Sequence, residues 1–127
     1  MTDNTISVEE YHLLVAQEGK RRNKYGAVAV IDEVHGRFDS TGEHRRWHEL
    51  LTLQGQGVIT DLRRQVRFPL VVEGVEVSAY IADFCYDEAG IAVVEDWKSS
   101  GTRTALYKLK RKLMKALYDV DIKETGL

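Results

Sequence analysis

Apolar residues recur at helical spacing in three parts of the chain, and each part predicts an amphipathic helix. The first part covers residues 8–18. The second covers residues 41–54, and a capping box of Ser40 and Glu43 marks its start. The third covers residues 103–118. The apolar stripe of each helix is expected to face a core.

Strand patterns fill the segments between the helices. Alternating apolar and polar residues predict a strand over 62–72, in which Pro69 favours an edge position or a bulge. Residues 75–86 carry apolar side chains on both faces, which indicates the middle of the sheet. A turn at 87–90 then leads back into a third strand over 91–98.

Shorter segments complete the predicted order of elements. Residues 27–31 are typical of a strand, and a turn at 35–36 leads into residues 37–38. Val120 and Ile122 mark a last short strand. From the second helix onward the order is αβββαβ, an α/β fold with a mixed (α+β) sheet. The final strand–helix–strand unit predicts a right-handed parallel crossover.

The composition fits one globular domain over residues 27–127, preceded by a helix and a basic arm over residues 1–26. Of the 127 residues, 43% are hydrophobic and 30% are charged, which excludes general disorder. No apolar run approaches the about 18 residues that a membrane helix needs. The acidic start of the chain differs from a secretory presequence, so we expect a cytoplasmic protein. Cys85 lacks a cysteine partner, which excludes internal disulfides and favours a small buried side chain.

The net charge of −2 hides a segregation of charges along the chain. The segment from Lys98 to Lys115 holds seven basic residues and no acid, and further basic clusters lie at 20–24 and 63–67. Acidic residues collect at 83–96. One basic helix is typical of a solvated surface, but three basic segments beside carboxylates favour a phosphate ligand with a cation between the negative groups. Nucleic acid is therefore the expected partner.

Two carboxylates and an amine are expected to meet on the second hairpin. An antiparallel hairpin centred near residue 89 places Asp83 opposite Asp96, and Lys98 faces the same side as Asp96. Like charges this close favour a cation between them, and hard oxygen ligands suit Mg²⁺ or Mn²⁺. An exposed ion pair of Asp83 and Lys98 is the alternative. The flanking segments are mostly apolar on both faces, so charges there would cost desolvation, which favours a functional site.

Glu43 has two open interpretations. It closes the capping box with Ser40, which explains this residue by itself. Its place on the apolar stripe with Trp47 and Leu50 also directs it inward, where a third acidic group could meet the carboxylates of the hairpin.

Other motifs carry less weight. His44 and His48 lie one helical turn apart, a spacing that can bind zinc, but no HExxH pattern is present and their face is opposite the apolar stripe. The chain has no phosphate loop, dinucleotide fingerprint or hydrolase elbow, so no nucleotide cofactor is expected. Trp97 and Tyr107 could stack on a base, although core packing is favoured.

The order of the acidic and basic residues resembles the PD-(D/E)XK nuclease superfamily. The chain is more closely similar to a family of small, largely uncharacterised phage and prophage proteins assigned to that superfamily, over about residues 20–124. The matching residues are Asn23-Lys24-Tyr25-Gly26, Phe38-Asp39-Ser40 with Glu43, Leu62, Gln65, Tyr80-Ile81-Ala82-Asp83-Phe84, Val94-Glu95-Asp96-Trp97-Lys98, Thr102 and Leu109-Lys110-Arg111-Lys112-Leu113. One departure is Ala82, which stands where the superfamily's name has proline.

The resemblance implies a metal-dependent active site on an αβββαβ, restriction-endonuclease-like core. The implied metal ligands are Asp83, Asp96, the carbonyl of Trp97 and Glu43. The implied catalytic residues are Asp83, Asp96, Glu43, Gln65 and Lys98, with Lys98 as the catalytic lysine.

These observations predict a DNA endonuclease that uses Mg²⁺ or Mn²⁺ and is of phage or prophage origin. The chain has little room for a target-recognition domain, so structure-selective cutting is expected, and cutting of two strands suggests a homodimer. The residues expected to hold DNA are Lys20, Arg21, Arg22, Lys24, Thr102, Lys108, Lys110, Arg111 and Lys112. One alternative is a non-catalytic DNA-binding or phage replication-accessory protein on a nuclease-like fold, and another is an interaction adaptor without DNA affinity.

Overall fold

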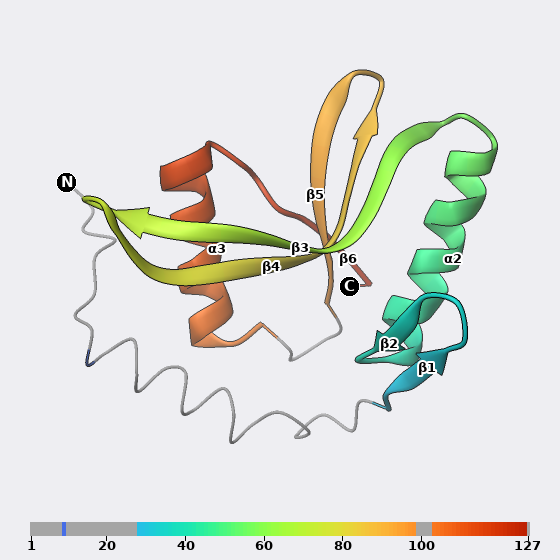
Figure 1. The fold of residues 1–127 in the computed structure, drawn as a ribbon, viewed down its shortest axis with the longest axis horizontal. Coiled ribbons are helices and arrows are strands. Elements are labelled where there is room, and N and C mark those ends of the chain that lie inside the picture. Colours follow the sequence, from blue (N-terminus) through green and yellow to red (C-terminus); the bar gives the residue numbers. More distant parts are fainter. Residues whose placement is uncertain (1–8, 10–27, 99–102, 127) are drawn as a thin grey trace.

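The main element of the computed structural model is a four-stranded sheet in the order β3-β4-β5-β6 (Figure 1). The structure describes residues 9, 28–98 and 103–126. The strands are β3 (Ile59–Val72), β4 (Val75–Glu88), β5 (Ile91–Trp97) and β6 (Lys123–Thr125). Neighbouring strands are antiparallel except β5 and β6, which are parallel. The predicted mixed sheet and its parallel final pair are therefore confirmed.

Two tight turns fix the register of the sheet. Glu73 and Gly74 join β3 to β4 with φ values of 49° and 81°, and Ala89 and Gly90 join β4 to β5 with 51° and 78°. Two consecutive left-handed residues match the right-handed twist of the strands that they connect. The predicted central position of β4 and edge position of the strand that holds Pro69 are both confirmed.

Two helices have the capping that the sequence pattern suggests. In α2 (Thr41–Gly55) the Ser40 hydroxyl accepts the backbone N–H of Glu43 at 3.1 Å. In α3 (Ala105–Tyr118) the Thr104 hydroxyl accepts the backbone N–H of Tyr107 at 3.1 Å. The predicted helices over 41–54 and 103–118 are confirmed, with ends that differ by one or two residues. The predicted helix over 8–18 lies outside the described residues, apart from Glu9.

The last strand differs from the prediction. It was expected at Val120 and Ile122, but the paired residues are those of β6. Asp119 ends α3 in the left-handed conformation, and Ile122 is buried in the core before the chain reaches β5. The apolar residues therefore anchor the connection, while the more polar segment Lys123–Thr125 supplies the pairing.

The predicted N-terminal hairpin is present, but its first strand differs in its bounds. The strands β1 (Val30–Asp32) and β2 (Gly36–Phe38) form a separate two-stranded sheet. In Figure 1 this sheet lies beside the first turns of α2. The expected strand over 27–31 is thus shifted toward the turn.

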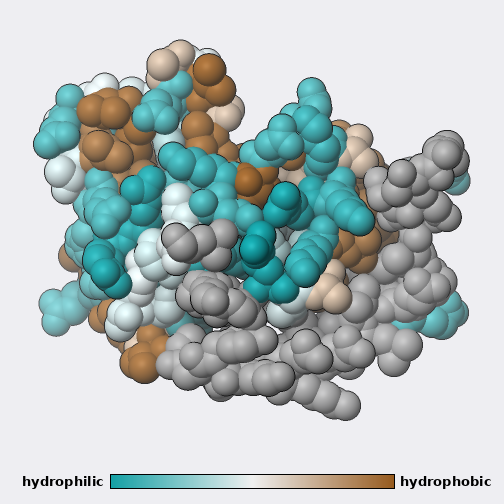
Figure 2. Space-filling model, turned by 180° about the vertical axis from the view of Figure 1, so that it is seen from behind, coloured by the Kyte–Doolittle hydropathy of each residue, from teal (hydrophilic) through white to brown (hydrophobic). Residues whose placement is uncertain are grey.

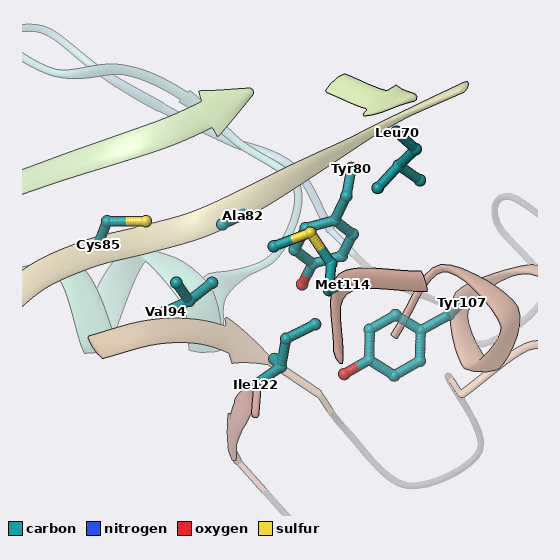
Figure 3. Close-up of a cluster of buried hydrophobic side chains, with 8 residues drawn as sticks. All are labelled: Leu70, Tyr80, Ala82, Cys85, Val94, Tyr107, Met114 and Ile122. Carbon is teal, nitrogen blue, oxygen red and sulfur yellow. The ribbon is translucent and has the colours of Figure 1, made fainter. Parts of the chain in front are cut away.

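Two buried clusters meet along β4. Tyr80 and Ala82 belong to a cluster with Met114 of α3, drawn in Figure 3, whereas Phe84 and Tyr86 belong to a second cluster beneath α2. Asp83 lies between Ala82 of the first cluster and Phe84 of the second. Cys85 is also buried, as expected of a lone cysteine.

Within the described residues, no helix has the length and apolar character needed to cross a membrane.

Candidate functional site

Two carboxylates replace the hydrogen-bond ladder where β4 and β5 separate. The last paired residues of the two strands are Phe84 and Glu95. Beyond them, the backbone N–H of Asp83 donates to Oδ1 of Asp96 at 2.9 Å, and the backbone N–H of Trp97 donates to Oδ2 of Asp83 at 2.9 Å. The two aspartates therefore lie at the same level of neighbouring strands, as the hairpin register predicts.

Gln65 and Glu43 reach the same level from β3 and α2. Arg64 and Val66 pair with residues 84 and 82, so Gln65 lies opposite Asp83. Gln65 has a φ of 54°, and its Nε2 donates to Oε1 of Glu43 at 3.4 Å. Glu43 is 4% exposed. Its backbone caps α2 while its carboxylate points inward, so both interpretations of Glu43 hold together.

The surroundings of these acids favour their neutral forms. Desolvation, followed by repulsion from Asp96 and Glu43, raises the pKa of Asp83. Burial raises the pKa of Asp96, against the opposing effects of Lys98 and of the Tyr80 hydroxyl. Burial and the charge of Asp39 raise the pKa of Glu43 to about 7. The three carboxylates therefore carry negative charge only at an energetic cost, which a cation would relieve.

Glu95, the neighbour of Asp96, is in the opposite electrostatic state. Its side chain is fully buried, and it accepts hydrogen bonds from Arg46 Nε at 2.7 Å and Arg46 Nη2 at 3.0 Å. The hydroxyls of Tyr86 and Thr125 donate to it at 2.7 and 3.0 Å. Burial raises its pKa, but the bonds from Arg46 and Tyr86 bring the net pKa below its usual range. Sequence reasoning missed this pair, because nothing in the spacing links Arg46 to residue 95.

The two aspartates differ from Glu95 in their partners. Within the described residues, neither Asp83 nor Asp96 has a Lys, Arg or His nitrogen within 4.0 Å. Tyr80 donates a hydrogen bond to Oδ2 of Asp96, and Lys98 Nζ lies 3.9 Å from the centroid of the Tyr107 ring. The positive charge of Lys98 lowers the pKa of both carboxylates by electrostatic attraction, without a direct ion pair.

The few carboxylates at this site suit a magnesium ion that keeps several waters, and they do not form a closed cage of protein ligands. Glu43, Asp83 and Asp96 do not form a three-residue group with ligand atoms within 4.8 Å of one another. Mg²⁺ usually keeps several waters and takes only one or two protein carboxylates. Asp83 and Asp96 supply such a pair, and Asp83 is partly exposed. The residues therefore fit a hydrated magnesium ion, with Glu43 as a nearby acid.

The expected DNA-binding residues are only partly described. Lys108, Arg111 and Lys112 are exposed on α3 and Lys110 is half-buried. Figure 2 shows hydrophilic side chains over the part of the surface where α3 lies. Arg111 pairs with Glu124 at 3.2 Å. The remaining residues predicted to hold DNA lie outside the described part of the chain; they are Lys20, Arg21, Arg22, Lys24 and Thr102.

The basic cluster at 63–67 is largely used within the fold. Arg64 donates to the backbone oxygens of His35 and Arg37 at 2.8 and 2.7 Å, and its guanidinium lies 3.7 Å from the Phe38 ring centroid. Arg67 pairs with Glu76 at 2.8 Å. Arg63 lies 3.5 Å from the carboxylate of Asp61. The expectation of a third phosphate-binding patch here is therefore weakened, because all three of its arginines already have partners.

Comparison with known proteins gives one match. The model of a family described as "Protein of unknown function (DUF1064)" matches residues 22–125. No curated protein and no solved structure matches the chain.

Proposed function

The chain belongs to the DUF1064 family, and we propose that it is a metal-dependent DNA endonuclease with a restriction-endonuclease-like core of the PD-(D/E)XK type. The observation that carries the proposal is the pairing of Asp83 and Asp96 beside Lys98 on strands that separate at that point. The adjacent Glu95 is neutralised by Arg46, whereas within the described residues this pair has no Lys, Arg or His nitrogen within 4.0 Å. Such a charge imbalance is expected of a site that binds a divalent ion.

Asp83 and Asp96 would hold Mg²⁺ or Mn²⁺, with the carbonyl of Trp97 as a further ligand. A bound ion of this kind polarises a phosphate oxygen and activates water. The Tyr80 hydroxyl and the Asp83 backbone N–H fix the orientation of the Asp96 carboxylate. These contacts limit the movement of the Asp96 carboxylate, a proposed metal ligand, before substrate binds.

Lys98 and Glu43 have separate roles in the proposal. The ammonium group of Lys98 stabilises the negative charge that develops on the phosphate. With a pKa of about 7, Glu43 can hold or release a proton near neutral pH, as a general acid or base must. Gln65, which donates to Glu43, positions that carboxyl group.

The proposed substrate is DNA recognised through its backbone. The basic side chains of α3 would contact phosphates, and such contacts orient DNA without reading its sequence. We therefore extend the proposal to structure-selective cutting of phage or prophage DNA in the cytoplasm by a homodimer.

Cleavage assays test the proposal. The purified full chain, with Mg²⁺ or Mn²⁺, is offered duplex, single-stranded and branched DNA. Cleavage should be lost in Asp83→Asn and Lys98→Ala and kept in Asp87→Asn, a matched substitution on the same strand. Cleavage that persists in the first two variants, or a wild type that cuts none of the substrates, refutes the proposal. Salt-dependent DNA binding without cleavage would favour the non-catalytic alternative.

A further inference from the structure

A second group of metal-ligating side chains lies away from the aspartate pair. Asp32 of β1 and His44 and His48 of α2 each direct one donor atom to a common point. Oδ2 of Asp32 lies 2.9 Å from Nε2 of His44 and 3.3 Å from Nε2 of His48. The two Nε2 atoms lie 3.2 Å apart. The three donors thus form a nearly equilateral triangle.

We infer that Asp32, His44 and His48 form a binding site for a divalent transition metal, with Zn²⁺ as the best-suited ion. Ligands at about 2.0–2.2 Å from a tetrahedral zinc ion are separated from one another by about 3.3–3.6 Å. The observed triangle is smaller by only a few tenths of an ångström. Two imidazoles and one carboxylate are donors that zinc prefers, whereas Mg²⁺ prefers oxygen alone.

The aspartate is oriented for this task by its own turn. Oδ1 of Asp32 accepts the backbone N–H groups of Val34 and His35 at 2.8 and 2.9 Å. These bonds occupy one carboxylate oxygen and leave Oδ2 facing the imidazoles. Outer contacts of this kind are typical of metal ligands, because they fix the direction of the donor atom.

The histidines are held in place by the helix and by aromatic contacts. His44 and His48 lie one turn apart on α2, and the His44 ring packs edge-on against Phe38 at a centroid distance of 4.9 Å. The side chain of His48 is 51% exposed, so the site is open to solvent on that side. Three protein ligands therefore leave room for water at a fourth position.

The site would join two parts of the fold. The β1–β2 hairpin is a separate sheet beside the start of α2 (Figure 1), and Arg64 already ties it to β3. A metal ion would add a link from Asp32 to α2, next to Glu43. Hydrogen bonds from both imidazoles to Asp32 can account for two edges of the triangle, but they leave the two Nε2 atoms 3.2 Å apart without a bond between them. One cation satisfies all three donors together.

The test uses the full chain after treatment with a chelator and dialysis. Zn²⁺ is added in the presence of excess Mg²⁺ and binding is followed by calorimetry and thermal unfolding. The wild type should bind one zinc ion per chain and unfold at a higher temperature, and Co²⁺ should give the visible absorption of a four-coordinate site. His48→Ala, at an exposed position, and Asp32→Asn should each weaken binding by at least the about 10–100-fold that loss of an outer contact costs.

Asp83→Asn is the matched control and should bind zinc as the wild type does. Absence of zinc binding by the wild type, unchanged affinity in His48→Ala, or loss of binding in Asp83→Asn would overturn the inference. This site does not rest on the proposed nuclease activity. The test of this site measures zinc binding, whereas the test of the proposed nuclease measures DNA cleavage with Mg²⁺ or Mn²⁺. Either proposal can therefore fail without the other.

Discussion

Replacement of Glu43 by glutamine tests the electrostatics of the aspartate site. Glu43 is almost fully buried, and burial followed by repulsion from Asp39 raises its pKa from 4.5 to about 7. The folded protein therefore keeps a proton that the unfolded chain has released between about pH 4.5 and about pH 7. The stability that Glu43 contributes is fully present below about pH 4.5 and is lost as the pH rises through about pH 7.

The size of the effect follows from the two pKa values. Proton linkage gives a loss of about 2.5 kcal/mol in the free energy of unfolding between about pH 5 and about pH 8. The upper limit is about 3.5 kcal/mol, because each pKa unit corresponds to about 1.4 kcal/mol. Glutamine has a similar shape and no charge, so Glu43→Gln should lack this loss. At about 4 °C per kcal/mol, its melting temperature should gain about 10 °C over the wild type across that pH range.

Thermal unfolding followed by circular dichroism, in buffers that contain a chelator, measures the difference. Wild type and Glu43→Gln are compared at about pH 5, 6, 7 and 8, a range that brackets the raised pKa. The gap between their melting temperatures should widen steadily with pH. Parallel curves would show that Glu43 keeps its ordinary pKa in the fold, and the electrostatic account of the site would be wrong.

Three further substitutions or reactions test other parts of the structure. Glu95→Gln should lower the free energy of unfolding by about 3–5 kcal/mol in urea titrations at neutral pH, since it leaves Arg46 without its buried anion; an unchanged midpoint would contradict this. Burial raises the pKa of the Cys85 thiol to about 11, so at pH 8 a thiol reagent should label native protein far more slowly than unfolded protein. Equal rates would show that Cys85 is accessible. Gly42→Ala should destabilise by about 1–3 kcal/mol, because its Cβ would overlap the Trp97 ring; a wild-type melting temperature would disprove that contact.

Local sequence signals predicted the sheet and much of the site. The turn at 87–90 defines the hairpin register, and that register alone brings Asp83 opposite Asp96. The inward direction of Glu43 follows from its helical phase with Trp47 and Leu50. These features depend on residues close in the chain or on one hairpin, where the geometry leaves little choice.

Contacts between distant elements could not be predicted in the same way. Arg46 meets Glu95 only because α2 packs on the sheet, and a charged residue on a helix carries no sign of its partner. His44 and His48 have the right spacing for a metal, but the proposed third ligand, Asp32, comes from a hairpin that forms its own two-stranded sheet. The last strand was misplaced because apolar residues served the core rather than the pairing.

The backbone N–H groups of Asp83 and Trp97 donate to carboxylates instead of to backbone carbonyls. These two amides can therefore report on the binding of a metal ion. Two main-chain amide protons are bound there by the same two carboxylate groups that would hold the proposed cation. Any change of occupancy must therefore alter the magnetic environment of these two amides. Their nuclear resonance signals would follow ligand arrival directly, without a label and without catalysis.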